Sequence, residues 1–241
     1  MISVVVPIGP NPVYRQYIHE CIDSIAAQTF RPTEVVIVDD QANLTADELK
    51  AITYRLSLKG INVTLYKTLW LSGVAHAFNF GVALAHNELI FMLGSDDTLR
   101  PWCLQDCFNT FQSVHDPRGY YHVDVQYSDT GVVQDLPCHA AMITKRLWHL
   151  NGGFPVESAL GAPDTMLISI MLGAKGKAGN LRHVISEKPP YLYRQHEQTD
   201  TASRGSRFHG PMYEVRNILT ANWEPATWTD WKEMQKHMDG G

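Results

Sequence analysis

Short runs of β-branched and other apolar residues alternate, along the first 100 residues, with longer segments whose apolar residues recur at helical spacing. The apolar runs cover residues 2–8, 34–39, 61–66 and 88–93. Each run is bounded by turn-forming residues, which is typical of strands buried on both faces. The helical segments cover about residues 12–28, 45–58 and 72–85. Alternation of this kind predicts a mostly parallel sheet with helices on both faces.

The order of elements is less regular after residue 100. The pattern predicts a helix to about residue 115, a strand at 120–128, a helix at 164–174 and a strand at 191–194. The polar segment that follows the last strand has the composition of a mobile loop. One or two amphipathic helices are predicted in the last 30 residues.

Composition and charge narrow the class of protein. The chain has 241 residues, of which 44% are hydrophobic and 19% charged, the profile of an ordinary globular domain. With 25 acidic against 20 basic residues the formal net charge is -5, so there is no surplus of positive charge to neutralise nucleic-acid phosphates. No stretch of about 18 apolar residues and no charged leader occurs, so we expect a cytoplasmic protein without a membrane span.

The four cysteines, Cys21, Cys103, Cys107 and Cys138, form no CxxC pair. They lack the density of a disulfide framework, so we expect reduced and mostly buried thiols. Cys103 and Cys107 could face one another on a helix, but no further ligands at zinc-site spacing accompany them. The cysteines therefore predict neither disulfides nor a zinc centre.

Two of the loops that follow predicted strands carry adjacent aspartates. Asp39 and Asp40 end the second strand, and Asp96 and Asp97 follow the fourth. Parallel α/β sheets bind ligands at the carboxyl ends of their strands, so these carboxylates are expected at one edge. Mg²⁺ and Mn²⁺ prefer oxygen ligands, commonly one or two carboxylates plus substrate phosphates. The pattern favours a metal–diphosphate site; alternatively Asp97 or Thr98 caps the helix predicted to follow.

Four segments carry a resemblance to a known family. They read ISVVVPIGPNPVYRQYIHECIDSIAAQTFRPTEVVIVDDQ at the start, GVAHAFNFGVALAHNELIFMLGSDD in the middle, then NGGFP and GAPDTMLI. In these segments the sequence resembles glycosyltransferase family 2, whose members have the GT-A fold, use nucleotide sugars and invert the anomeric carbon. The resemblance implies an α/β fold of GT-A type, in which a Rossmann-like, mostly parallel sheet has helices on both faces.

The resemblance also implies roles for residues of the first half. Pro7 would line the nucleotide pocket, and Asp40, with Asp39 beside it, would accept hydrogen bonds from the base and the ribose. Asn79 matches a recurrent asparagine of the family and is therefore counted with the residues that bind the nucleotide sugar. Helix packing is the alternative explanation for the segment around Asn79.

Further roles follow for the acidic residues. Asp96 and Asp97 match the end of the family's DxD-type motif, and both would be metal ligands, with Asp97 the more direct one. Asp96 is also counted with the residues that bind the nucleotide sugar. Asp164 would be the general base that deprotonates the acceptor hydroxyl, and its alternative role is to cap the helix that follows it. The chain departs from the family pattern at two positions. Gly94 stands where many relatives have the first Asp of the motif, and Pro163 stands where many have Glu.

Arg194 and His196 follow the last predicted strand, in a region from which some GT-A enzymes complete the metal or diphosphate site. His196 could ligate the metal through a neutral ring nitrogen, and Arg194 could bind phosphate oxygens with two parallel hydrogen bonds. The alternative is an ordinary surface histidine and a strand-end arginine. The polar segment 195–207 would then form a lid over the donor.

The leading hypothesis is a metal-dependent inverting glycosyltransferase that uses Mn²⁺ or Mg²⁺. It would move a single sugar from a nucleoside-diphosphate sugar, preferably a UDP-sugar, to a hydroxyl of a glycan or other acceptor. One GT-A domain would span residues 1–210, with a nucleotide-sugar half at 1–100, an acceptor half at 101–210 and a helical extension at 211–241. No QxxRW pattern occurs, which by resemblance disfavours a processive synthase.

The main alternative is a catalytically degenerate module of the same fold, which binds a nucleotide sugar or glycan without turnover. The departures at Gly94 and Pro163 motivate it. A sugar-phosphate nucleotidyltransferase would want a glycine-rich phosphate loop after the first strand, and GPNPVYR is a poor substitute. A nicotinamide dehydrogenase is disfavoured because the chain lacks GxGxxG.

Overall fold

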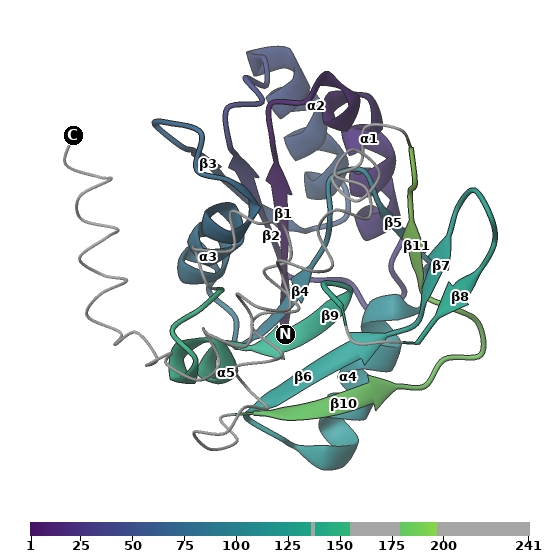
Figure 1. Ribbon diagram of the computed structural model, residues 1–241. Coiled ribbons are helices and arrows are strands. Elements are labelled where there is room, and N and C mark those ends of the chain that lie inside the picture. The colour runs from purple at the N-terminus through teal and green to yellow at the C-terminus, as the bar shows by residue number, and fades with distance from the viewer. Residues whose placement is uncertain (136–137, 155–178, 197–241) are drawn as a thin grey trace, which may run out of the picture.

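Two β-sheets form the framework of the protein (Figure 1). The computed structural model describes residues 1–135, 138–154 and 179–196. The larger sheet has seven strands in the order β10-β6-β9-β4-β1-β2-β3, and the smaller sheet has four in the order β5-β11-β7-β8. Neighbouring strands of the larger sheet are parallel except at β9, which runs antiparallel to β4 and β6.

The bounds of the elements follow the chain order. The larger sheet contains β1 (Ile2–Ile8), β2 (Glu34–Asp39), β3 (Asn62–Lys67), β4 (Leu89–Met92), β6 (Gly119–Val123), β9 (Ala141–Thr144) and β10 (Asn180–Val184). The smaller sheet contains β5 (Thr98–Leu99), β7 (Val125–Tyr127), β8 (Val133–Gln134) and β11 (Tyr191–Tyr193). The helices of the described residues are α1 (Pro12–Ala26), α2 (Ala46–Ser57), α3 (Val74–Leu84), α4 (Cys103–Val114) and α5 (Lys145–Leu150).

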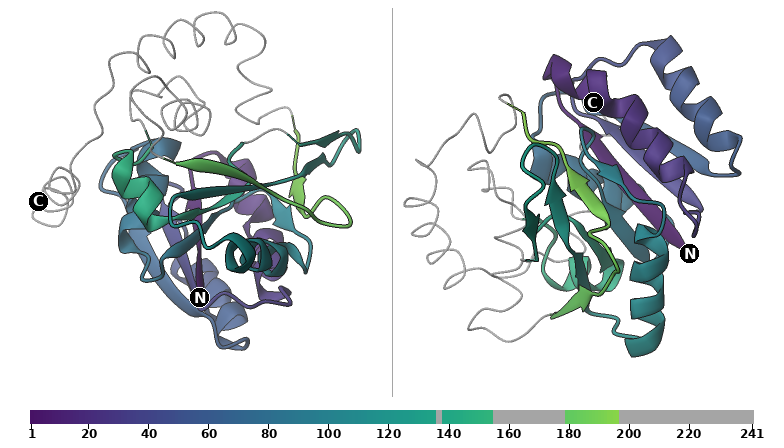
Figure 2. Two further views of the ribbon diagram at one scale, coloured as in Figure 1. Left: turned by 90° about the horizontal axis from the view of Figure 1, so that it is seen from below. Right: turned by 90° about the vertical axis from the view of Figure 1, so that its right-hand side faces the viewer.

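Helices cover both faces of the larger sheet, and each face has its own apolar core. On one face α1, α2 and α4 pack through fully buried residues such as Ile22, Leu56 and Leu104. On the other face α3 and α5 pack through Val82 and Trp148. The right-hand view of Figure 2 shows the purple, violet and teal helices of the first group on one side of the sheet. Because β1, β2 and β4 lie between the two cores, they are apolar on both faces.

Sequence signals set the ends of the first helices. Asn11 caps α1 by accepting a hydrogen bond from the N–H of Val13, and a proline follows it at the start of the helix. Thr45 and Glu48 form a capping box at the start of α2. Gly60, with φ of 71°, lets the chain leave α2 and enter β3. The strands and helices predicted before residue 100 are therefore present.

The prediction of one strand at 120–128 is wrong. β6 ends at Val123, β7 begins at Val125, and the two strands belong to different sheets. The chain passes from one sheet to the other at Asp124, where no glycine or proline interrupts the sequence. The pattern therefore reads as one continuous strand. The sequence pattern also gives no sign of β5, β8, β9, β10 or α5. The predicted helix at 164–174 and the extension at 211–241 lie outside the described residues.

The strand order reverses beside β1, and this reversal positions the site. β2 and β3 follow β1 toward one edge, whereas β4 lies on the other side of β1. β4 pairs with β1 only as far as Val5 opposite Met92, while β1 continues beside β2 to Ile8. The strands therefore part at their carboxyl ends, and such switch points are where open α/β sheets bind ligands.

Pro7 lies in the parted segment of β1. The carbonyl of Val5 accepts a hydrogen bond from Leu93 on the β4 side, and that of Ile8 accepts one from Asp40 on the β2 side. Backbone groups alternate along a strand, so Pro7 faces the β4 side, where no ladder partner needs an N–H donor. A proline is thereby accommodated in a central strand at the mouth of the switch point.

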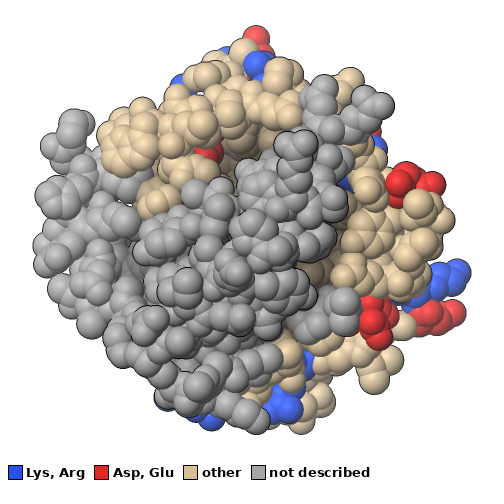
Figure 3. Space-filling model, in the orientation of Figure 1, with Lys and Arg blue, Asp and Glu red and all other residues tan. Residues whose placement is uncertain are grey.

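On the face shown in Figure 3, the described Lys, Arg, Asp and Glu side chains gather mainly near the rim. Among the described residues no helix is long and apolar enough to cross a membrane. The four cysteines are free thiols, and Cys103 and Cys107 both lie on α4.

Candidate functional site

Asp97 lies at the centre of a hydrogen-bonded cluster just beyond β4. Its side chain is 2% exposed. Oδ2 accepts a hydrogen bond from the hydroxyl of Tyr191 at 2.6 Å, and Oδ1 accepts one from the backbone N–H of Arg194 at 2.7 Å. His139 Nε2 lies 3.6 Å from Oδ2. Residues distant in the sequence therefore hold both oxygens of this carboxylate.

The helix-capping alternative for Asp97 and Thr98 is wrong. The next helix, α4, begins at Cys103, its N-cap residue is Trp102, and no side chain caps it. Thr98 instead begins β5 of the smaller sheet. The position of Asp97 is explained by its partners Tyr191 and Arg194 and not by a helix terminus.

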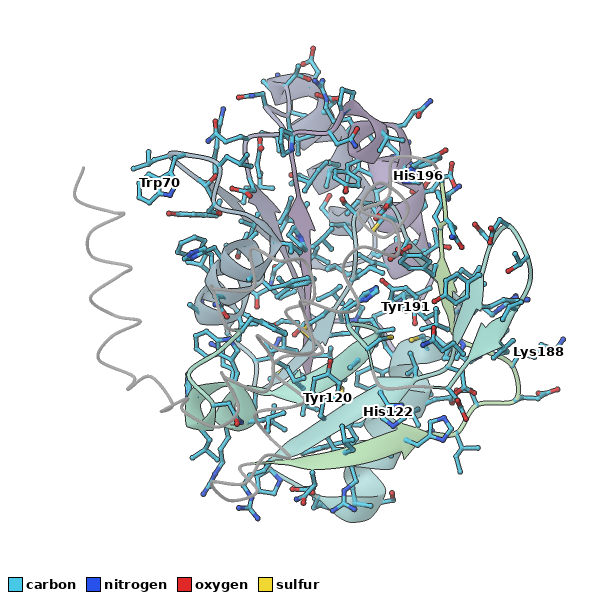
Figure 4. The ribbon with its side chains drawn as sticks, viewed as in Figure 1. Trp70, Tyr120, His122, Lys188, Tyr191 and His196 are labelled. Atoms are coloured by element: carbon cyan, nitrogen blue, oxygen red, sulfur yellow. The ribbon has the colours of Figure 1, made fainter. Side chains whose placement is uncertain are left out.

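Asp96 is directed toward His196. Its Oδ2 lies 3.2 Å from Nε2 of His196, and both side chains are 15% exposed. The Nε of Arg194 donates to the backbone carbonyl of Asp96 at 2.9 Å. Figure 4 shows His196 beyond the end of β11. The structure thus brings together Asp96, Asp97, Arg194 and His196, which the sequence analysis had selected from segments almost 100 residues apart.

The guanidinium of Arg194 is directed at α1. Its Cζ lies 4.0 Å from the centroid of the Tyr17 ring, and Nη2 forms an ion pair with Glu20. Together with the bond from Nε to Asp96, these contacts brace the turn at residues 94–97, here called the acidic turn, against α1. A contact with two phosphate oxygens would require Nη2 to leave Glu20, and it stays a prediction.

Burial and repulsion between the two carboxylates shape the electrostatics of the site. Desolvation, and next the charge of Asp97, raise the pKa of Asp96 to about 6. Burial, and next Asp97, raise the pKa of Tyr191 well above its ordinary value, so its hydroxyl stays protonated and donates. Burial likewise raises the pKa of Cys21, whose Sγ lies 3.5 Å from the carbonyl of Gly94. A nearby cation would stabilise this desolvated negative charge.

The donor set fits a hard divalent cation that is held partly by a substrate. Within the described ranges no three His, Cys, Asp or Glu side chains form a ready metal cage. Mg²⁺ commonly uses one or two carboxylates and completes its coordination with water and substrate phosphates, and Mn²⁺ favours the same oxygen ligands. Asp96 and Asp97 supply the carboxylates, and His196 can add a nitrogen.

Asp39 shapes the loop that follows β2. Its side chain is buried, and its two oxygens accept hydrogen bonds from the backbone N–H groups of Asn43 at 3.1 Å and Leu44 at 3.0 Å. Gln41 and Asn43 take positive φ values of 65° and 56° in the same loop. The carboxylate of Asp39 therefore stabilises a tight and strained loop at the carboxyl edge of the sheet.

Asp40 holds the segment that leads from β3 into α3. Its Oδ1 accepts hydrogen bonds from the Thr68 hydroxyl at 2.9 Å and from both the N–H and the hydroxyl of Ser72 at 2.8 Å. Its Oδ2 accepts one from the N–H of Gly73 at 2.7 Å. The chain's own donors thus engage Asp40 as well as Asp39. Hydrogen bonds from these carboxylates to a base or ribose stay a prediction.

Asn79 links α3 to α5 and to the segment after it. Its Oδ1 accepts hydrogen bonds from Trp148 Nε1 at 2.9 Å and from the N–H of Phe154 at 2.8 Å. Its Nδ2 donates to the carbonyl of Phe154 at 2.9 Å, and all three residues are buried. The structure therefore gives Asn79 the role of anchoring the NGGFP segment, and its contact with a donor stays a prediction.

Replacing Asn79 by alanine should lower the free energy of unfolding by about 3 kcal/mol, because three buried polar groups of Trp148 and Phe154 would lose their partners. Thermal or urea unfolding followed by circular dichroism measures the change. Asn109→Ala is the control, since Asn109 lies exposed on α4 and should change stability by about 0.5 kcal/mol or less. A loss no larger than that of the control would show that Asn79 is not an anchor.

Sequence reasoning missed three residues around the acidic pair, namely Tyr191, His139 and Tyr17. Tyr191 bonds Asp97, His139 lies beside both, and Tyr17 lies under Arg194. A signal for Tyr191 exists in the YLY segment, because a strand predicted to end near the site places alternate residues on its inner face. Histidine and tyrosine on the other elements carry no comparable signal.

Two predicted features lie outside the described residues. One is Asp164, the predicted base, together with Pro163 before it. The other is the predicted lid, of which only Gln195 and His196 are described. Their roles stay predictions.

The family model of glycosyl transferase family 2 matches residues 3–143. The chain belongs to this family. The matched stretch runs from β1 into β9 and includes both strands that part at the switch point. The GT-A-type α/β fold expected from the sequence is confirmed by the solved structures that this family 2 chain resembles.

Similar proteins cover the chain to different extents. An uncharacterized glycosyltransferase of Nostoc sp. is 30% identical over 124 residues, which are 52% of this family 2 chain and 37% of that relative. The chain spans between 32% and 37% of the length of the curated relatives it matches.

Two solved structures illustrate the shared fold. The crystal structure of S. aureus TarS 1–349 in complex with UDP-GlcNAc superposes with a TM-score of 0.67 and 22% identity, over 92% of this family 2 chain and 68% of that one. The mannosyltransferase PcManGT from Pyrobaculum calidifontis, in complex with GDP-Man and Mn²⁺, gives a TM-score of 0.55 and 19% identity, over 91% and 61% of the two chains.

Proposed function

We propose that this chain transfers a single sugar from a nucleoside-diphosphate sugar, preferably a UDP-sugar, to a hydroxyl of a glycan or another acceptor. One observation carries the proposal: the adjacent carboxylates Asp96 and Asp97 lie at the switch point of a family 2 chain, just beyond the place where β1 and β4 part. The complex of TarS with UDP-GlcNAc supports a uridine donor.

The donor would lie along the carboxyl edge between β2 and β4. Pro7 would line one wall, and Asp39 and Asp40 would accept hydrogen bonds from the base and ribose. Arg194 would turn from Glu20 toward the diphosphate, where its cation meets negative charge. Residues 1–100 would form the donor half and residues 101–210 the acceptor half. Residues 191–196 belong to the acceptor half in the sequence, but they would contact the donor beside Asp96 and Asp97.

Asp96, Asp97 and His196 would hold Mn²⁺ or Mg²⁺. When bound, such a cation offsets the negative charge on the diphosphate leaving group. The raised pKa of Asp96 supports this assignment, since two buried and repelling carboxylates gain most from a cation. The Mn²⁺ in the PcManGT complex supports the same choice of metal.

Asp164 would act as the general base of an inverting displacement. Its carboxylate would take the proton of the acceptor hydroxyl, whose oxygen bonds to the anomeric carbon on the face opposite the diphosphate. The bond between that carbon and the diphosphate oxygen breaks, and the nucleoside diphosphate leaves. The configuration at the anomeric carbon is thereby inverted.

A direct test incubates the full chain with a panel of nucleotide sugars and Mn²⁺ and measures the nucleoside diphosphate released. We expect release from a UDP-sugar, a drop of about 100-fold or more when EDTA removes the metal, and recovery when Mn²⁺ is added back in excess. Absence of both release and donor binding for every member of the panel would contradict the proposal.

A second candidate is a module that binds a nucleotide sugar or glycan without turnover. Gly94 favours it, because the family resemblance leads one to expect an acidic residue at this position, and so does Pro163. Binding of a UDP-sugar by the native chain, without release of UDP in the presence of Mn²⁺ and acceptors, would support the module and contradict the enzyme.

A further inference from the structure

Gly94 lies directly beneath the carboxylate of Asp97. The two residues end a tight turn in which the N–H of Asp97 donates to the carbonyl of Gly94 at 3.1 Å. A Cβ at position 94 would lie 2.7 Å from Asp97 Oδ2 and 3.2 Å from Asp96 Oδ1. A side chain at this position, acidic or not, would therefore require the carboxylates of Asp97 and Asp96 to move from their observed places.

Tyr191 closes the same turn from β11. Its hydroxyl donates to Asp97 Oδ2 at 2.6 Å and accepts from the N–H of Gly94 at 3.2 Å. The side chain is fully buried, with its ring stacked on Phe91 and edge-on to His139. Figure 4 shows Tyr191 pointing from β11 toward the interior. One hydroxyl thus bridges the two ends of the turn.

Hydrogen bonds from the described residues leave acceptor positions on the Asp97 carboxylate for a further ligand. A carboxylate has about four acceptor positions on its two oxygens. Among the described residues, Tyr191 donates to Oδ2 and the N–H of Arg194 donates to Oδ1, while His139 Nε2 lies 3.6 Å from Oδ2. The two hydrogen bonds fix the rotation of the carboxylate, so the directions of the remaining lone pairs are fixed as well.

We infer that Tyr191 is a positioning residue that orients Asp97 toward a divalent cation, and that Gly94 provides the space in which Asp97 is held. The inference rests on the proposed function and deepens it. Gly94 would then contribute to a functional metal site and would not be a sign that the site has degenerated. Residues that hydrogen-bond to a metal ligand change metal affinity by about 10- to 100-fold when they are removed.

The test uses Tyr191→Phe, which keeps the ring and removes the hydroxyl. Mn²⁺ is titrated into the full chain in the presence of UDP, and bound metal is measured by electron paramagnetic resonance, a readout that needs no transfer. We expect the dissociation constant for Mn²⁺ to rise by about 10-fold or more. Tyr121→Phe is the matched control, since Tyr121 is also fully buried and donates one hydrogen bond, to the carbonyl of Asp116.

Gly94→Ala provides a second route to the same displacement. Its Cβ would push Asp97 away from Tyr191, so we expect a comparable loss of Mn²⁺ affinity. If the two residues act as one unit, the double variant should lose less than the sum of the two single losses. This variant also keeps the inference testable if Tyr191→Phe fails to fold.

The outcomes separate the inference from the proposed function. Wild-type affinity for Mn²⁺ in both Tyr191→Phe and Gly94→Ala would overturn the inference and leave the proposed function standing. A loss in Tyr191→Phe no larger than that in Tyr121→Phe would also overturn it, since it would reflect general destabilisation. Failure of the wild-type chain to bind Mn²⁺ with UDP would overturn both.

Discussion

Asp97→Asn should lower kcat/KM for sugar transfer by about 10²- to 10³-fold. Asparagine keeps the size of the side chain and leaves one oxygen for Tyr191 or for the N–H of Arg194. It removes the negative charge that would hold a cation beside the donor diphosphate. Release of UDP from a UDP-sugar at saturating Mn²⁺, and Mn²⁺ binding in the presence of UDP, measure the two effects.

Asp116→Asn is the control for Asp97→Asn. Asp116 is another buried carboxylate, but it pairs with Arg182 and Asn180 away from the acidic turn. Its loss should reduce stability and leave kcat/KM within about threefold of the wild type at a temperature where both variants are folded. Transfer by Asp97→Asn at a rate close to that of the control would remove Asp97 from the proposed chemistry.

Asp164→Asn should separate donor binding from turnover. If Asp164 is the base, as we propose, the variant would leave the acceptor hydroxyl without one, so we expect kcat to fall by about 10²- to 10⁴-fold. The nucleoside diphosphate of the donor would lie on the face of the sugar opposite Asp164, so the dissociation constant of a UDP-sugar should change by less than about threefold. Calorimetric titration with the donor and measurement of released UDP test both expectations.

Glu157→Gln is the control for Asp164→Asn, because it neutralises another acid of the same stretch, between Phe154 and Asp164. It should leave kcat within about threefold. Turnover by Asp164→Asn equal to that of this control would show that another residue takes the proton. A fall in donor affinity as large as the fall in kcat would assign Asp164 to binding.

The first half of the fold follows from local sequence features. Residues 2–8 and 34–39 are buried throughout and mostly apolar because their strands lie between two cores, and Asn11 and Thr45 cap the helices beside them. The second half is harder to predict because its strands change sheets. No glycine or proline marks the step at Asp124, and β9 enters antiparallel between β4 and β6.

The site divides in a similar way. The sequence predicts that Asp96, Asp97, Arg194 and His196 gather, because strand ends and family motifs are local patterns, and the structure brings these four together. The sequence does not reveal that Tyr191 bridges Gly94 and Asp97, because that contact joins segments almost 100 residues apart. The contact also depends on the absence of a Cβ at position 94, which would lie against the Asp97 carboxylate. The sequence also does not reveal that the carboxylates of Asp39 and Asp40 are engaged by neighbouring loops.

The bridge between Gly94 and Tyr191 has a consequence for the family's evolution. A glycine at position 94 without a hydroxyl at position 191 would leave Asp97 without its hydrogen bond from β11, and a side chain at position 94 would displace Asp97 from that hydroxyl. Mutations at the two positions should therefore be tolerated mainly in combination, so that homologues inherit both or neither.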